Sequence, residues 1–166
     1  NEIWVVGTDG QGLRRLTSVP YLQHEPAWSA DGSWIYFLSG DGGQAHDLWR
    51  VSVDGGQAEQ LSVARLYHFE LAPGPGGQLA FSNNRSGNYE NYVQSNGSEA
   101  RPLAADPALD GHPSWSPDGA SLAFQSLRSG SFQIWRAPVA GGPAVQLSRD
   151  SGGARAPVWW HPPRGD

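Results

Sequence analysis

The stretch Pro113-Ser114-Trp115-Ser116-Pro117-Asp118-Gly119, continued by Ala120-Ser121-Leu122-Ala123-Phe124, decides the fold of this chain. Pro-Asp-Gly favours a tight turn, because proline presets φ, aspartate bonds the nearby backbone and glycine accepts positive φ. The residues on either side alternate between apolar and small side chains. The stretch therefore predicts two short antiparallel strands joined by a turn.

This unit recurs along the chain. Trp28-Ser29-Ala30-Asp31-Gly32 matches it closely, Leu71-Ala72-Pro73-Gly74 matches it more loosely, and Pro157-Val158-Trp159 begins a fourth copy. Counted from residues 28, 71, 115 and 159, the spacings are 43, 44 and 44 residues. A constant period of this length is typical of a repeat architecture.

A second pattern has nearly the same period. Segments that resemble a further strand contain Trp4, Trp49, Tyr92 and Trp135, and the spacings of these aromatic residues are 45, 43 and 43. Each is followed by a glycine turn: Asp9-Gly10, Asp54-Gly55-Gly56, Asn96-Gly97 and Gly141-Gly142. We expect two-residue hairpins there, with both central residues at positive φ.

Each repeat thus predicts four antiparallel strands and essentially no helix. In the second copy we expect strands near 69–72, 79–83, 89–95 and 100–103. The predicted fold is all-β, a β-propeller of four-stranded blades. The complete blades would span about 26–62, 69–103 and 113–147, with partial blades at 1–17 and 157–166. A β-sandwich with coincidentally similar hairpins is the alternative.

The two partial blades together would lack their second strand. We therefore expect a piece of a longer propeller of about six to eight blades; the alternative is that a partner, or residues outside this sequence, complete the ring. The chain also contains no Met, so we expect residue 1 not to be a translation start.

Composition excludes several classes. Of the 166 residues, 38% are apolar and 16% charged, and the net charge is −5. All basic residues are scattered arginines, which argues against a nucleic-acid partner. The absence of cysteine excludes disulfides and thiolate sites. No apolar run is long enough to predict a transmembrane segment.

The Trp-Ser-Pro-Asp-Gly motif, its Leu-Ala-Phe strand and the Asp-Gly-Gly hairpin resemble the TolB-like, WD-repeat-like propeller family. The resemblance implies a binding scaffold in the periplasm or outside a bacterial cell. Such blades also occur ahead of prolyl-oligopeptidase-type hydrolases. This sequence lacks the Gly-x-Ser-x-Gly motif of a serine nucleophile, so we predict no catalytic residue, no cofactor and no enzymatic activity.

Two sets of candidate site residues follow. Counting back three residues from each first-strand anchor gives Glu25, His68, His112 and Ala156, which we expect to surround the channel entrance. The first three could bind a divalent metal or an anion, or could instead hydrogen-bond loops or face solvent. Four tryptophans could anchor a partner or pack between blades: Trp34, Trp49, Trp135 and Trp160. Four acidic loop residues should be solvated: Asp41, Asp47, Asp106 and Asp110.

The predicted function is a non-catalytic scaffold for protein–protein interaction, within a larger protein or an envelope assembly. One alternative is the substrate-gating propeller of a prolyl-oligopeptidase-type hydrolase. The other is a propeller that binds a small ligand or a metal ion.

Overall fold

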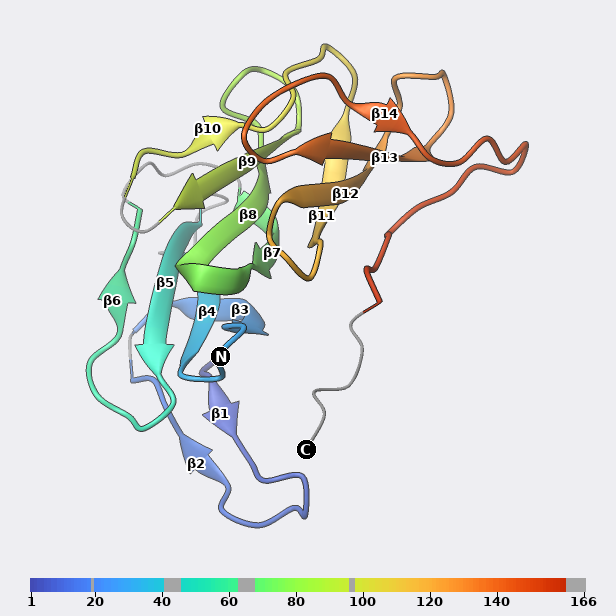
Figure 1. Ribbon diagram of the computed structural model, residues 1–166. Coiled ribbons are helices and arrows are strands. Elements are labelled where there is room, and N and C mark those ends of the chain that lie inside the picture. The colour runs from blue at the N-terminus through green and yellow to red at the C-terminus, as the bar shows by residue number, and fades with distance from the viewer. Residues whose placement is uncertain (19, 41–45, 63–67, 96–97, 161–166) are drawn as a thin grey trace.

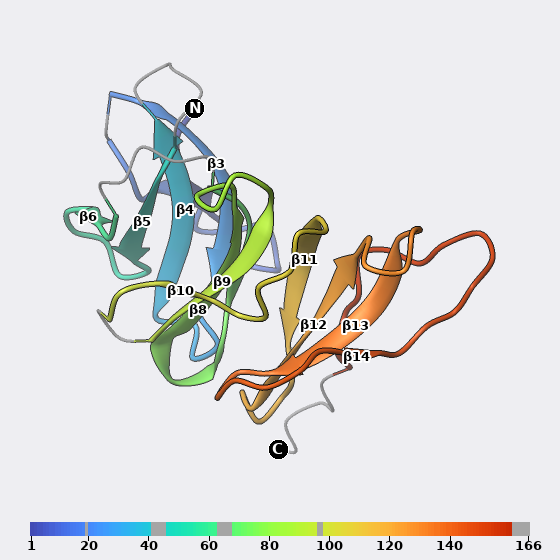
Figure 2. The same cartoon turned by 90° about the horizontal axis from the view of Figure 1, so that it is seen from above.

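A computed structural model describes residues 1–18, 20–40, 46–62, 68–95 and 98–160. Within these ranges the regular secondary structure is almost entirely β-strand. Three four-stranded antiparallel sheets follow one another along the chain and lie side by side (Figures 1 and 2). We call them blades A, B and C.

Every blade has its strands in chain order. Blade A contains β3 (Leu22–Trp28), β4 (Trp34–Gly40), β5 (Asp47–Ser52) and β6 (Glu59–Gln60). Blade B contains β7 (His68–Pro73), β8 (Gln78–Asn83), β9 (Glu90–Ser95) and β10 (Arg101–Pro102). Blade C contains β11 (Asp110–Trp115), β12 (Ser121–Ser126), β13 (Gln133–Pro138) and β14 (Val145–Gln146). This is the predicted four-strand repeat.

The hydrophobic core lies between blades. One face of blade A and one face of blade B meet through buried Leu38, Leu48 and Phe81. The other face of blade B meets blade C through a second cluster that includes Val93 and Phe124. Because both faces of these sheets are covered, the central strands β4, β8 and β12 are buried along most of their length. The sheets thus shield each other, as the repeat predicted.

The ends of the chain add partial blades. β1 (Trp4–Val5) pairs with β2 (Arg14–Arg15), and Ile3 and Leu16 pack against Ile35, Phe37 and Val51 of blade A. At the other end no strand is assigned over 154–160, but that segment runs beside blade C. There the Trp159 amide donates to Ser114 Oγ at 3.2 Å and the Ala154 amide to Phe132 O at 2.7 Å.

The turns differ from the prediction in one respect. Asp9 and Asp54 do not adopt positive φ, whereas Gly10 and Gly55 do, at 79° and 100°. The Gly10 amide donates to Gly7 O at 2.8 Å and the Gly55 amide to Ser52 O at 3.0 Å. The glycine is the last residue of each turn, and the paired strands end at Val5–Arg14 and Arg50–Glu59. More than two residues therefore connect the strands, so the prediction of two-residue hairpins was wrong here. Asn96-Gly97 lies outside the described residues.

Blade B has a distinctive turn between its first two strands. A short 3₁₀ segment, η1 (Pro75–Gly77), replaces the Ser-x-Asp-Gly turn of the other blades, and Gly76 in it has φ 67°. Over the residues that the structure describes, the expectation of essentially no helix holds apart from this single turn. In the described part of the chain no helix has the length and apolar character needed to cross a membrane.

Candidate functional site

The first strand of each blade is interrupted at the same place. The pairing register shifts between His24 and Ala27 in β3, between Phe69 and Ala72 in β7, and between Gly111 and Ser114 in β11. Such a shift is a β-bulge, which bends a strand and re-aims a side chain. At these bulges and in the C-terminal segment lie the only non-glycine residues of positive φ in the described chain: Glu25, Glu70, His112 and Ala156.

The bulge residues correct one sequence prediction. The structural counterpart of Glu25 and His112 in blade B is Glu70, not His68. The reason is that Pro73, rather than Leu71, pairs as Trp28 and Trp115 do. The signal was visible in the sequence, since Glu70-Leu71-Ala72 matches Glu25-Pro26-Ala27 by its first and third residues. Because blade B has no tryptophan at the anchor position, the prediction aligned Leu71 with the two tryptophans, and its register was wrong by two residues.

Carboxylates at the bulges link neighbouring blades. Glu25 Oε2 accepts a hydrogen bond from the Glu70 amide at 2.7 Å, and Glu70 Oε2 accepts one from the His112 amide at 2.5 Å. At the next joint Gln125 Oε1 accepts from the Ala156 amide at 3.1 Å. Bonds from an amide to a carboxylate are stronger than neutral ones, so this row ties consecutive first strands together.

Glu70 is the most heavily bonded member of the row. Its Oε1 lies 2.8 Å from His112 Nε2, and the Ser82 hydroxyl donates to its Oε2 at 2.6 Å. Gly111 makes room for this carboxylate, because a Cβ there would lie 2.8 Å from Glu70 Oε2. The Glu70 carboxylate is therefore held in one orientation between blades B and C.

A cavity of about 300 Å³ adjoins Glu70. Phe69 and Tyr89 supply aromatic walls, with ring centroids 5.8 Å apart, and Leu109 and Gln125 contribute from the blade C side. A concave site with aromatic walls and a few fixed polar groups suits a peptide or a small ligand.

Asp110 lines the same cavity and was expected to be solvated, which was wrong. It is 2% exposed, and its carboxylate lies 2.5 Å from Arg128 Nη2. Burial raises the pKa of Asp110, while hydrogen bonds from Ser126 and Arg128 oppose that rise. Asp47 accepts from Gln60 Nε2 at 2.9 Å and Asp106 accepts from the Ala108 amide at 2.9 Å. Asp41 lies outside the described residues.

The predicted metal ligands do not converge. Within the described ranges no group of three or more His, Cys, Asp or Glu residues is arranged to hold a metal ion. His68 is buried against Phe81, with ring centroids 5.0 Å apart, and belongs to the joint between blades A and B. His112 and Glu25 lie at the bulges of their first strands.

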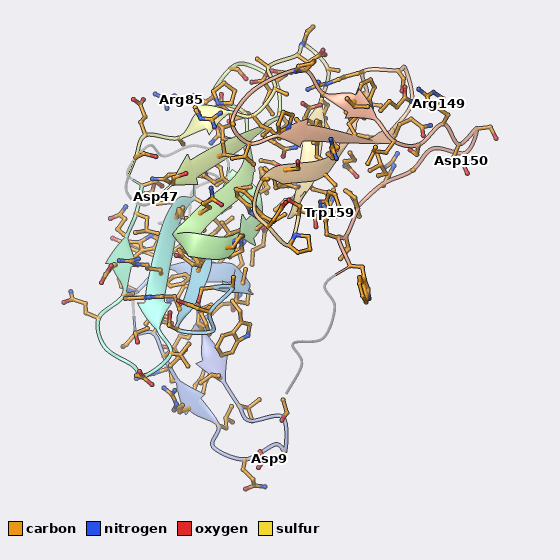
Figure 3. The ribbon with its side chains drawn as sticks, in the orientation of Figure 1. Asp9, Asp47, Arg85, Arg149, Asp150 and Trp159 are labelled. Carbon is orange, nitrogen blue, oxygen red and sulfur yellow. The ribbon has the colours of Figure 1, made fainter. Side chains whose placement is uncertain are left out.

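Three of the four predicted anchor tryptophans pack between blades. Trp34 contacts the core between blades A and B and carries the Arg50 guanidinium 4.2 Å from its ring centroid. Trp49 stacks with Phe37, and Trp135 joins the core between blades B and C. Trp160 is 75% exposed. Figure 3 shows Trp159 beside blade C, while Arg149 and Asp150 lie far out on the loop after β14.

These features define a class of protein, a β-propeller with three complete blades, partial blades at both ends and a row of linked first strands. A family model described as "TolB beta propeller domain" matches residues 71–166. The chain belongs to this family.

Individual proteins agree with that assignment. The chain is 31% identical over 152 residues to the Tol-Pal system protein TolB of Bordetella pertussis, covering 86% of this chain and 33% of that protein. It is 28% identical over 131 residues to the uncharacterized peptidase YuxL of Bacillus subtilis, covering 75% of this chain and 18% of that protein. The crystal structure of TolB from Acinetobacter baumannii superposes with a TM-score of 0.77 at 21% identity, covering 93% of this chain and 39% of that one.

The chain spans a third or less of the length of these curated relatives. What it shares with them is the blade repeat.

Proposed function

We propose that this chain is a non-catalytic module that binds a protein partner between the first strands of blades B and C. The observation that carries the proposal is the cavity lined by Phe69, Tyr89 and Glu70, whose carboxylate is held in place by the His112 ring. Aromatic side chains next to oriented polar groups are frequent anchors in protein interfaces. An extended peptide segment fits this site, because it offers both amide donors and side chains.

Selection of peptides against the whole chain tests this. A phage-displayed peptide library is panned on the immobilised protein, and the enriched peptides are measured by calorimetry. Tyr89→Ala should weaken binding about tenfold or more, as expected for an aromatic anchor. Tyr21→Ala is the matched control, because Tyr21 is 44% exposed and does not line this cavity. Equal affinity for both variants, or no enriched peptide, contradicts the proposal.

The proposed setting is the bacterial periplasm, within a larger envelope assembly. The name of the Bordetella relative, Tol-Pal system protein TolB, supports this setting. Fractionation of the source bacterium carrying a tagged chromosomal copy is the test. Recovery of the tagged protein in the cytoplasm alone contradicts it.

A second candidate is a propeller that controls access to a peptidase domain elsewhere in a longer protein. The match to the peptidase YuxL favours it. In that case the full-length protein should hydrolyse aminoacyl-p-nitroanilides and be inactivated by a fluorophosphonate, whereas a purely binding protein does neither. Exposed Trp160 remains a predicted partner contact under either function.

A further inference from the structure

Three histidines gather at the joint between blades A and B. His24 lies in β3, His46 directly precedes β5, and His68 begins β7. The rings of His24 and His46 meet edge to face with centroids 4.4 Å apart. His46 also meets Phe69, the residue after His68, with ring centroids 6.4 Å apart. The group therefore joins two strands of one blade to the first strand of the next.

Each of these rings has a buried nitrogen without a hydrogen-bond partner: His24 Nε2, His46 Nδ1 and His68 Nε2. Buried polar atoms in folded proteins are normally paired, and three exceptions at one joint are unusual. A charged imidazole carries two N–H groups, and these unpartnered nitrogens offer it no hydrogen bond that would stabilise the charge. The joint therefore favours uncharged imidazoles.

The hydrogen bonds of His68 show why adding a second proton to its ring is unfavourable. Asn83 Oδ1 accepts from the Arg85 amide at 2.6 Å, which orients the Asn83 side chain so that its NH₂ faces His68. Asn83 Nδ2 lies 3.2 Å from His68 Nδ1, so that ring nitrogen is the acceptor and Nε2 carries the proton. A proton added at Nδ1 would point at another donor. It would also charge a ring that is only 4% exposed.

The neighbouring charged groups do not offset the cost of protonating these buried histidines. The pKa of His68 is lowered to about 4, mainly by burial; Asp47 opposes this change and His46 adds to it. Burial and His46 also lower the pKa of His24, against the influence of Glu25, whose Oε1 lies 3.8 Å from His24 Nδ1. Arg85 and His68 line the same cavity of about 430 Å³ (Asp47 and Arg85 are labelled in Figure 3). In a further contact, the Phe69 ring meets the Tyr89 ring, with centroids 5.8 Å apart.

We propose that the joint between blades A and B is an acid-sensitive contact, closed while His24 and His68 are neutral and opened when they are protonated. Protonation of His24 places a charge on a ring whose centroid lies 4.4 Å from that of the His46 ring, and protonation of His68 removes the acceptor at its Nδ1. Among the described residues, the joint between blades B and C has no such group of histidines. Its residue equivalent to His68 is Asp110, which is paired with Arg128.

The direction of the pH effect follows from linkage. A histidine whose folded pKa is lowered stabilises the closed joint above its unfolded pKa of 6.5 and loses that stabilisation as pH falls toward about 4. For His68 alone, the opening equilibrium constant rises about twentyfold between pH 7 and pH 5.

Hydrogen exchange followed by mass spectrometry tests the proposal on the whole chain. After correction for intrinsic exchange rates, peptides covering β7 should exchange about twentyfold faster at pH 5 than at pH 7. Peptides covering β12 and β13 should change little. In His68→Gln, which keeps an acceptor for Asn83, the β7 response should be largely lost. His112→Gln is the matched control and makes the same change outside this joint; because the His112 ring pairs with Glu70 of β7, the control is read at peptides covering β3, where it should leave the pH response intact.

Two results would overturn the proposal. One is equal acceleration of blades A, B and C in the wild-type chain. The other is an unchanged pH response in His68→Gln. If that variant does not fold, titration of the wild-type histidine ring carbons by NMR decides instead. A His68 resonance that titrates below pH 5 supports the acid-sensitive joint, and one that titrates near 6.5 rules it out.

Discussion

Trp28 and Trp115 occupy the same position of the repeat but different environments. Each ends a first strand, and they pair with Ile35 and Leu122, respectively. Trp115 is 5% exposed, and its indole N–H donates to Ala72 O at 2.8 Å. Trp28 is 52% exposed. The same local sequence thus produces a core residue in one blade and a surface residue in another.

The neighbouring blade explains the difference. Trp115 lies on the backbone of Gly74, where a Cβ would be only 2.5 Å from the indole ring. Trp28 faces the side of blade A where β1 and β2 cover Ile35, Phe37 and Val51 but leave the indole accessible. The repeat therefore sets the strand and the turn, while the preceding blade decides whether the tryptophan is buried.

Alanine substitution of the two tryptophans should give the largest contrast. Trp115→Ala should lower the free energy of unfolding by about 3–5 kcal/mol, because it opens a cavity between blades B and C. Trp28→Ala should cost less than about 1 kcal/mol, as expected for an exposed side chain. Urea denaturation of both variants measures the difference. Similar costs would mean that Trp28 is covered in solution.

A methyl group placed under Trp115 tests the contact from the other side. Gly74→Ala should cost about 1–3 kcal/mol through overpacking against the ring. Gly152→Ala is the control, since Gly152 is exposed and has no positive φ. A fully stable Gly74→Ala variant would show that the indole can shift without loss.

Substitution of the two glutamates at the bulges, Glu70 and Glu25, should give a smaller difference in the free energy of unfolding. Glu70 accepts from the Ser82 hydroxyl and the His112 amide and is also paired with the His112 ring, whereas Glu25 accepts from the Glu70 amide. Glu70→Gln should therefore cost about 1–2 kcal/mol and Glu25→Gln about half of that or less. Thermal unfolding of the pair checks the order, and a larger cost for Glu25→Gln would reverse this account of the row.

The smallest effect on stability is expected for the turn aspartates Asp31 and Asp118, because blades A and C are alike at these positions. Hydrogen bonds from Ser29 and Ser33 lower the pKa of Asp31 to about 2, and hydrogen bonds from Ser116 and Ala120 lower the pKa of Asp118. A carboxylate with a lowered pKa stabilises the fold above its unfolded pKa of 3.8, and this is lost as pH falls toward 2. Asp31→Asn and Asp118→Asn should both flatten the acid side of the stability profile slightly and to a similar extent.

The candidate site was only partly predictable. The sequence placed Glu25 and His112 at equivalent positions, because both precede a matching tryptophan by three residues. It missed Glu70, because blade B has Pro73 where the other blades have tryptophan. It also treated Asp110 as a loop residue, since its partner Arg128 is eighteen positions away and only the fold brings them to 2.5 Å.

By itself, the sequence determined the repeat: the number of complete blades, the order of their strands and the places where the chain turns. Those features depend on neighbours within a few residues, through alternation of apolar side chains and the conformational preferences of Asp, Pro and Gly. Only the tertiary structure decided which tryptophan is buried, which carboxylate links two blades and where three histidines meet. These depend on contacts between residues some twenty to forty-five positions apart, and no local pattern specifies them.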